Sequence, residues 1–227
     1  MTLLSKIGQV LNTEISTEIL FKKKELQENT YCFIDEMNKR RSYYELNDRV
    51  SISPEYLIQL IKQAARSCPS ALNSQSARVV ILMKTSHQDF WLMVKEVQHK
   101  SVAEAIWESV DQRVDRCRDA FGTVLFFEDQ KIIQNLQKRQ PLQSDKFSQW
   151  SEQSSGMVQY AVWTALASTG LGASIQHFNP SIDQATSTLL SLPAHWQLKA
   201  QLVFGNIAQP TTDKYEIEDE ALFRIFS

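Results

Sequence analysis

Two almost continuous apolar runs constrain the fold of this chain more than any other feature. They lie at residues 78–83 and 122–127, with the sequences RVVILM and GTVLFF. A strand that is polar on one face alternates apolar and polar residues, whereas a strand covered on both faces reads as an unbroken apolar run. We therefore expect a sheet that carries helices on both sides.

Helical and strand patterns alternate along the rest of the chain. Ser53 and Pro54 open a helix, because serine is a good N-cap and proline is tolerated at the first helical position. Apolar spacing predicts a helix over residues 3–21, helices around residues 90–97, 102–114, 130–138 and 181–191, and a long helix from Trp150. That long helix is apolar nearly all round, so we expect it to be buried at the centre.

Two further strands complete the predicted sheet. The first, residues 172–178, follows Gly170, a natural helix cap. In the second, residues 197–204, apolar and polar residues alternate, so we expect one face to be more buried than the other. Strands alternate with helices, but the connections are irregular. The pattern favours one α+β domain with a mixed sheet and helices on both of its faces.

Composition excludes several classes of protein. The 227 residues carry 24 Lys and Arg against 26 Asp and Glu, a net charge of -2, which does not favour a nucleic-acid partner. The sequence holds no apolar run near the roughly 20 residues of a membrane span, and we expect no secretory signal. Cys32, Cys68 and Cys117 form neither a CxxC pair nor a metal motif, so we expect a reducing, cytoplasmic setting without a structural metal.

The segment between the first core helix and the first apolar run is unusually rich in small polar side chains. Residues 68–78 read CPSALNSQSAR, with no acid and no glycine. Asn and Gln side chains offer both donors and an acceptor, so they suit a flat ligand edge that alternates the two. By itself the segment also fits an ordinary polar turn, whose Ser and Asn side chains bond their own backbone.

Residues elsewhere favour ligand binding over that ordinary turn. The sequence has no glycine-rich phosphate loop, no HExxH and no nucleophile elbow, so we predict no catalytic side chain. Amides, hydroxyls and arginines remain, and they suit a cofactor that brings its own reactivity. Arg40 and Arg41, followed by Ser42, can clamp a phosphate. Flavin mononucleotide (FMN) offers both a phosphate and a flat ring edge.

With these residues in view, the chain resembles the FMN-dependent nitroreductase family from about Met37 to the C-terminus. The resemblance rests on residues 40–42, 69–75 and 170–173, and on the stretches 122–129, 150–157 and 176–180, which look like a compact fungal and bacterial branch. It implies a three-layer α/β/α sandwich with a mixed central sheet over residues 31–227. Residues 1–30 would form a helical extension to which the resemblance gives no role.

The resemblance also implies a homodimer with FMN at the subunit interface. Arg40 and Ser42 would face the phosphate and ribityl end with Arg41 beside them, and Lys214 would be a further phosphate partner. The ribityl chain and pyrimidine edge would meet Ser70, Asn73 and Gln75. Gln176 and His177 would bring a backbone N–H near flavin N5. Glu152, Ser154 and Ser155 of the neighbouring subunit would line the opposite wall.

One departure from the family pattern concerns the substrate pocket. The family often has Pro-Trp after the Asn-Ser-Gln triplet, and this chain has Ser76–Ala77. A wall of the pocket therefore differs here.

The implied reaction is a two-step exchange. NAD(P)H would pass a hydride to flavin N5 and leave, and a nitroaromatic, quinone or similar acceptor would then take the electrons. A positive charge from Arg40 or Arg41 would stabilise the reduced flavin. One alternative is a flavin-binding stress or regulatory protein with little turnover. Another is a helical adaptor that docks through the N-terminal helix and the C-terminal tail, whose apolar end (residues 222–226) we expect to be buried on a second subunit.

Overall fold

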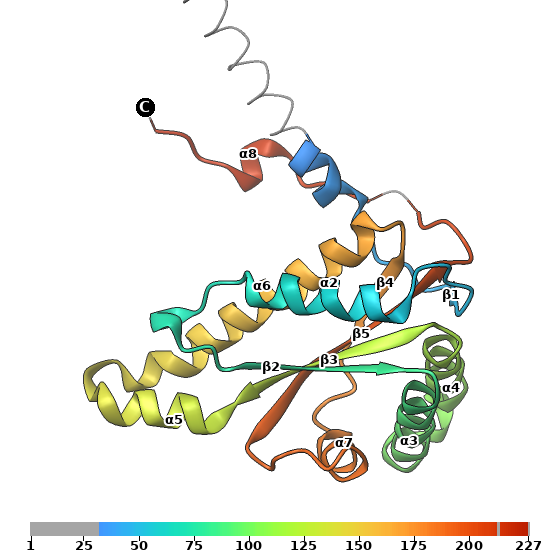
Figure 1. Ribbon diagram of the computed structural model, residues 1–227, viewed down its shortest axis with the longest axis horizontal. Coiled ribbons are helices and arrows are strands. Elements are labelled where there is room, and N and C mark those ends of the chain that lie inside the picture. The colour runs from blue at the N-terminus through green and yellow to red at the C-terminus, as the bar shows by residue number, and fades with distance from the viewer. Residues whose placement is uncertain (1–31, 213, 227) are drawn as a thin grey trace, which may run out of the picture. The chain divides into compact units, whose positions relative to one another are not determined.

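The structure, a computed structural model, describes residues 32–212 and 214–226 (Figure 1). The chain divides into two compact units, Met1–Arg40 and Arg41–Ser227. In the first unit residues 32–39 are helical. The predicted extension over residues 1–30, with its helix over residues 3–21, lies outside the described residues. The second unit holds the sheet and the elements that flank it.

A five-stranded sheet forms the centre of the second unit. Its strands are β1 (Leu46–Asn47), β2 (Ala77–Met83), β3 (Gly122–Asp129), β4 (Gly172–Gln176) and β5 (Trp196–Ile207). The order is β1-β5-β3-β2, and β4 also pairs with β5. Every ladder is antiparallel. The sheet is mixed only through a single parallel bridge between Ser42 and Ala173.

Helices cover both faces of the sheet, which confirms the predicted α+β three-layer architecture. The helical elements are α2 (Pro54–Arg66), η1 (Ala71–Asn73), α3 (Thr85–Ser101), α4 (Glu104–Arg118), α5 (Gln130–Arg139), η2 (Pro141–Lys146), α6 (Phe147–Ser168), α7 (Asp183–Leu189) and α8 (Asp219–Leu222). One apolar core joins α2 and α6 to the sheet, and a second joins α3, α4 and the residues around α7 to its other face (Figure 1).

Local sequence signals set the ends of several elements. The Ser53 side chain accepts a hydrogen bond from the Tyr56 N–H at the start of α2. Asp129 does the same for the Lys131 N–H at the start of α5. Gly170 ends the turn after α6 with φ 83°, a conformation that costs other residues a steric penalty. These three signals fix where the helices of the second unit meet the sheet.

Strand β5 differs from its prediction. Its alternating sequence indicated one drier face, but residues 200–205 are all buried. The reason is its position, because β5 pairs with β3 along one edge and with β4 along the other while helices cover both faces. Even the polar Gln201 is buried, and its side chain bonds the Phe178 N–H at 2.9 Å and Asn179 at 3.1 Å.

Helix α6 also differs from its prediction. One side packs on the sheet through Val158, Val162 and Leu166, but Met157 is 41% exposed and Tyr160 40% exposed. The helix therefore lies on the surface of this single chain rather than at its centre. The C-terminal apolar residues are exposed as well, with Ile225 and Phe226 at 90% and 94%.

A cavity at the centre of β5 should destabilise the whole unit. Leu202 is fully buried and packs between the sheet and helices α2 and α6. We expect Leu202→Ala to lower the free energy of unfolding by about 2–5 kcal/mol, because it removes buried methyl groups and leaves a void. Urea unfolding measures the change. The matched control is Leu142→Ala, at a side chain 97% exposed, and an equal loss in both variants would contradict this account.

Candidate functional site

The polar segment after α2 forms the wall of a cleft. Ser70, Asn73 and Gln75 line it together with residues of α2, the edge strand β2 and helix α6, and its volume is about 420 Å³. The Gln75 N–H donates to the Ser70 hydroxyl at 3.0 Å, and the Asn73 N–H donates to the Ser70 carbonyl at 2.9 Å. The backbone of the segment thus closes on Ser70, as a polar turn would.

The side-chain amides of the same segment do not form the hydrogen bonds that are typical of an ordinary turn. Among the described residues, the side-chain amides of Asn73 and Gln75 have no hydrogen-bond partner, although both residues line the cleft. In an ordinary turn, Asn side chains bond the nearby backbone. Here the segment holds its amides outward, available to a ligand.

Backbone strain concentrates in this segment. Leu72, Asn73 and Gln75 have φ of 53°, 51° and 48°, and none of them is glycine. Positive φ is uncommon for such residues and persists only where surrounding contacts enforce it. The contacts with α6 include the Ala71 N–H donating to the Ser154 hydroxyl at 3.4 Å. Strain of this kind gathers at ligand-binding segments.

A second group of predicted residues lies at the opposite edge of the sheet. Ser42 bridges to Ala173 in β4, and the Tyr43 N–H donates to the Ala173 carbonyl at 3.0 Å. The Arg41 guanidinium donates to the Thr212 carbonyl at 2.5 Å. Lys214 follows two residues after Thr212, with its ammonium 3.7 Å from Glu216. Arg41, Ser42 and the start of the C-terminal tail therefore share one neighbourhood.

A groove starts from this neighbourhood and follows β4. Tyr43, Tyr44, Arg116 and residues 209–212 line its first part, of about 370 Å³. Tyr44 and Arg116 also line the second part, of about 320 Å³, which ends at Arg113 and Gln176. Arg113 thus lies at one end of the groove and Arg41 beside Thr212 at the other, while Arg116, where the two parts meet, is paired with Glu45 at 3.3 Å.

Arg113 is held rigidly at the far end of the groove. Its Nε donates to the Gln176 side-chain oxygen at 2.7 Å, and its guanidinium carbon lies 5.1 Å from the centre of the Phe178 ring. The Gln176 amide in turn donates to the Ser174 hydroxyl at 3.1 Å. The two terminal nitrogens of Arg113 have no hydrogen-bond partner within the described part of the chain, so they remain available to a ligand.

The predicted residues Gln176 and His177 have distinct surroundings. The Gln176 side chain is 1% exposed and committed to Arg113 and Ser174. The ring Nδ1 of His177 lies 3.2 Å from the Lys199 carbonyl. A carbonyl only accepts, so Nδ1 carries the proton and Nε2 faces away from that bond.

The nine predicted residues do not meet in one cavity of a single chain. Ser70, Asn73 and Gln75 lie beside β2, whereas Ser42 and Gln176 lie on or beside β4. In the order β2-β3-β5-β4, three strand spacings put roughly 14 Å between those edges. Arg40 belongs to the other unit, so its position relative to the groove is not described.

Sequence reasoning missed Tyr44, Arg113 and Arg116. The two arginines stand three residues apart on α4, so they share one helix face. Helical spacing of two arginines was therefore the available signal. This signal is not specific on its own, because such pairs are usually solvated, and only the hydrogen bond from Arg113 to Gln176 at the end of β4 shows that it belongs to a groove.

Known proteins are similar to this chain in both fold and sequence. The model of the nitroreductase family matches residues 37–206. The chain belongs to the nitroreductase family. A relative from Saccharomyces cerevisiae, HBN1, is named as a nitroreductase and is 31% identical over 192 residues, which cover 83% of this chain and 94% of HBN1.

Solved structures agree with this assignment. Nitroreductase CinD from Lactococcus lactis, in complex with nicotinic acid, has a TM-score of 0.80 and 40% identity and covers 86% of this chain and 100% of its own. A nitroreductase in complex with FMN from Exiguobacterium sibiricum shares the fold, with a TM-score of 0.64 and 13% identity over 86% of this chain and 97% of its own.

Membership of the nitroreductase family supports a flavin-type oxidoreductase. Among the described residues, no helix is both long enough and apolar enough to cross a bilayer. The same residues hold no cluster of three His, Cys, Asp or Glu side chains that could bind a metal.

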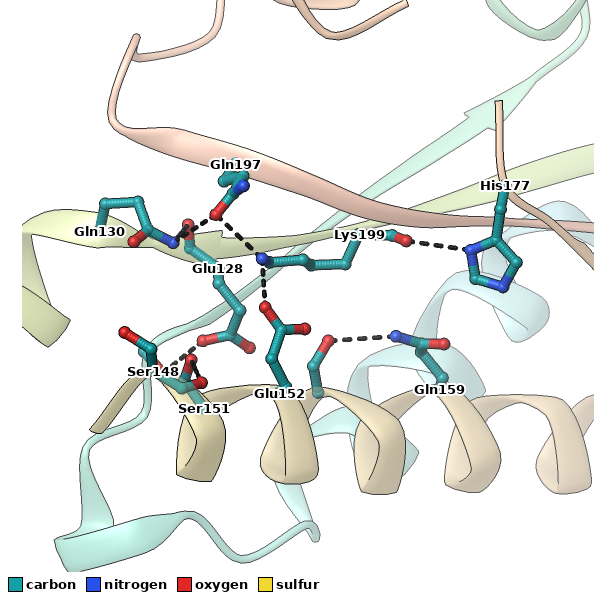
Figure 2. A network of polar contacts seen from close by, with 11 residues as sticks. Glu128, Gln130, Ser148, Ser151, Glu152, Gln159, His177, Gln197 and Lys199 are labelled. Carbon is teal, nitrogen blue, oxygen red and sulfur yellow. Dashed lines mark hydrogen bonds and ion pairs between the residues drawn. The ribbon is translucent and has the colours of Figure 1, made fainter. Parts of the chain in front are cut away.

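A buried acid at the end of β3 was also missed by sequence reasoning. Glu128 is fully buried and accepts a hydrogen bond from the Ser76 hydroxyl at 2.5 Å. Its other oxygen, Oε1, has no partner within the described chain. Figure 2 shows Glu128 facing Ser151 and Glu152 of α6, with Lys199 of β5 beside them. Burial is the largest cause that raises the pKa of Glu128, to about 7; the Ser76 hydrogen bond and the charges of Lys199 and Arg78 oppose this shift, and the nearby Glu152 adds to it.

The raised pKa of Glu128 makes stability depend on pH. The folded chain holds this proton up to about pH 7, whereas a free carboxyl of ordinary pKa 4.5 loses it earlier, so the free energy of unfolding falls as pH rises between those values. We expect Glu128→Gln to abolish this fall. The difference should be on the order of 2 kcal/mol, less than the full shift because nearby exposed groups screen the charge.

Urea unfolding of both proteins from pH 5 to 8 measures this difference. The matched control is Glu55→Gln, at an exposed acid in the first turn of α2. Parallel curves for the parent chain and Glu128→Gln would contradict the raised pKa.

Proposed function

We propose that this chain is an FMN-dependent oxidoreductase that takes hydride from NAD(P)H and reduces nitroaromatic, quinone or similar acceptors. The observation that carries the proposal is the groove along β4, with Arg113 held by Gln176 at one end and Arg41 bound to the Thr212 carbonyl at the other. When bound, FMN supplies the chemistry of accepting a hydride and passing on two electrons. The side chains described above then bind and orient the reactants.

The length and charge of the groove fit FMN. From Ala173, beside Ser42, to His177 the chain spans four residues, or roughly 13 Å of extended backbone. Arg41, Ser42 and Lys214 suit the phosphate at one end, with Arg40 next to Arg41 in the sequence. At the other end, the free nitrogens of Arg113 suit the carbonyl oxygens of a flavin ring.

The positive charge beside the ring comes from α4 in this proposal. The sequence led us to expect it from Arg40 or Arg41. Arg113 instead lines the end of the groove that reaches Gln176, whereas Arg41 lies by Thr212 and Arg116 is paired with Glu45. A fixed cation there favours a ligand edge that gains negative charge. The backbone after Gln176 keeps its predicted role of approaching the reactive edge of the ring.

A homodimer would complete the site. Ser70, Asn73 and Gln75 are too far from the groove to serve it within one chain, but the side-chain amides of Asn73 and Gln75 have no partner among the described residues. Exposed apolar side chains lie on the same loop, at Leu72, and on α6, at Met157 and Tyr160. A two-fold interface through this surface would set the loop of each chain against the groove of the other, and the exposed tail end would bury there as well.

Relatives support the acceptor class. Structures of CinD are described in complex with chloramphenicol and with 4-nitrophenol, both of which are nitroaromatic, and CinD is 39% identical to this chain in those structures. We extend that class to this chain. Ser76 and Ala77 replace the usual Pro-Trp beside the cleft, so the range of acceptors should be its own. Three free cysteines fit a reducing compartment such as the cytoplasm.

An absorbance spectrum tests the proposed function. We expect the purified chain to be yellow and to be bleached by NAD(P)H without oxygen, and colour should return with a quinone or 4-nitrophenol. A yellow protein that NAD(P)H does not bleach would favour the low-turnover flavin-binding alternative. A colourless protein that does not bind added FMN would remove both flavin functions and leave the adaptor alternative.

Subunit mixing tests the two-chain site. Asn73→Ala and Arg113→Ala should each lower FMN affinity at least tenfold, because each leaves a polar ligand edge unpaired. Mixed after unfolding and refolding, the two variants should recover about one quarter of tight sites, since half the dimers are mixed and each has one intact site. If the mixed dimers recover no tight FMN site, Asn73 and Arg113 contribute to the same site from the same chain, and the two-chain site is wrong. FMN fluorescence quenching counts the sites.

A further inference from the structure

Glu128 is buried where no cation is left to neutralise it. Lys199, from β5, forms an ion pair with Glu152 of α6. Arg78, from β2, pairs with Asp129 at 2.9 Å. Each nearby cation is thus committed to another acid, and Oε1 of Glu128 has no hydrogen-bond partner in the described chain. A bare carboxylate is costly in such a place, so this geometry favours the protonated acid.

Figure 2 shows how these groups come together from three elements. Glu152 reaches up from α6 to Lys199, and Glu128 lies beside them above Ser151. If both acids were ionised, the cluster of Glu128, Glu152 and Lys199 would carry one net negative charge. A proton on Glu128 makes the cluster neutral, and Glu152, 54% exposed, connects it with solvent.

The proton on Glu128 has a short path toward the cleft. The Ser76 hydroxyl, 2.5 Å from Glu128, both donates and accepts hydrogen bonds. Ser76 is 1% exposed and does not itself line the cleft, but its sequence neighbours Gln75 and Ala77 do, so the hydroxyl lies behind the wall that they form. The Asp129 N–H donates to the Ser76 carbonyl at 2.9 Å, which fixes this residue against the end of β3.

We propose that Glu128 is a proton-relay residue that supplies, through the Ser76 hydroxyl, the proton consumed when an acceptor held between the cleft of this chain and the groove of the second copy is reduced. This proposal rests on the proposed function. It adds to that function a proton source and the route by which the proton reaches the acceptor.

Reduction of a quinone to a hydroquinone consumes one hydride, which the proposed function supplies, and one proton. Glu128 gives its proton to the Ser76 oxygen as the original Ser76 proton moves through a water at the cleft wall to a quinone oxygen. The hydride and this proton together turn the two quinone carbonyls into the two hydroxyl groups of the hydroquinone, and Glu128 becomes a carboxylate. Solvent returns the proton after the product leaves.

The first measurement needs no flavin. The infrared C=O band of a protonated carboxyl is followed from pH 5.5 to 8.5 in the full chain without cofactor. We expect a band that titrates near pH 7 and is absent from Glu128→Gln but present in the control Glu55→Gln. Failure to find a band that depends on Glu128 at pH 6 would overturn the proposal whatever the flavin does.

The second measurement follows the acceptor half of the reaction alone. Holoenzyme reduced in advance is mixed with a quinone in a stopped-flow instrument, and the return of flavin absorbance is timed at each pH. Above about pH 7 the rate of the parent chain should fall roughly tenfold per pH unit, as expected for a general acid. Glu128→Gln should be slower by about a hundredfold at pH 6 and independent of pH.

Variants of Ser76 separate a relay from a merely structural role. Ser76→Ala should match Glu128→Gln in rate, and Ser76→Thr, which keeps the hydroxyl, should stay within about threefold of the parent. Equal pH profiles in the parent and Glu128→Gln, at equal flavin content, would overturn the relay while leaving the proposed function intact. A chain that binds no flavin would overturn both, and the infrared band would still report the proton on Glu128.

Discussion

Burial of the two central strands on both faces is the constraint on which the rest of the structure depends. Strands β3 and β5 lie between two helical layers, so every position of β3 and residues 200–205 of β5 are buried. Polar chemistry is therefore confined to strand ends and sheet edges. Arg113, Ser42 and Gln176 gather around β4 at one edge, and the Ser70–Gln75 loop lies beside β2 at the other.

This separation gives the oligomeric proposal a physical basis. A ligand that needs both groups cannot reach across a sheet roughly 14 Å wide within one chain. A second copy can bring its strained loop to the first copy's groove. Positive φ angles at Leu72, Asn73 and Gln75 are costly in an isolated chain, and contacts from a bound ligand or a partner can offset that cost.

Glu128 is one of the polar side chains buried in β3 and β5, and it is an acid without a cation of its own. It stands one residue before Asp129, which caps α5 and pairs with Arg78. The sequence Glu-Asp at a strand end does not indicate that one of these two acids is paired with a cation and the other is not. Asp129 has its own cation, whereas Glu128 points between the sheet and α6, where the nearest ammonium already serves Glu152.

The sequence by itself determined four of the five strands, most helices, the family and the polar loop, because apolar periodicity, caps and small polar residues are local signals. It did not determine burial on both faces of β5, the exposed face of α6 or the groove arginines on α4. Those depend on which elements become neighbours, and residues such as Arg113 and Gln176 lie 63 positions apart in the chain. Only the tertiary structure decided that Asn73 and Gln176 lie at opposite edges, and that Glu128 is left without a cation.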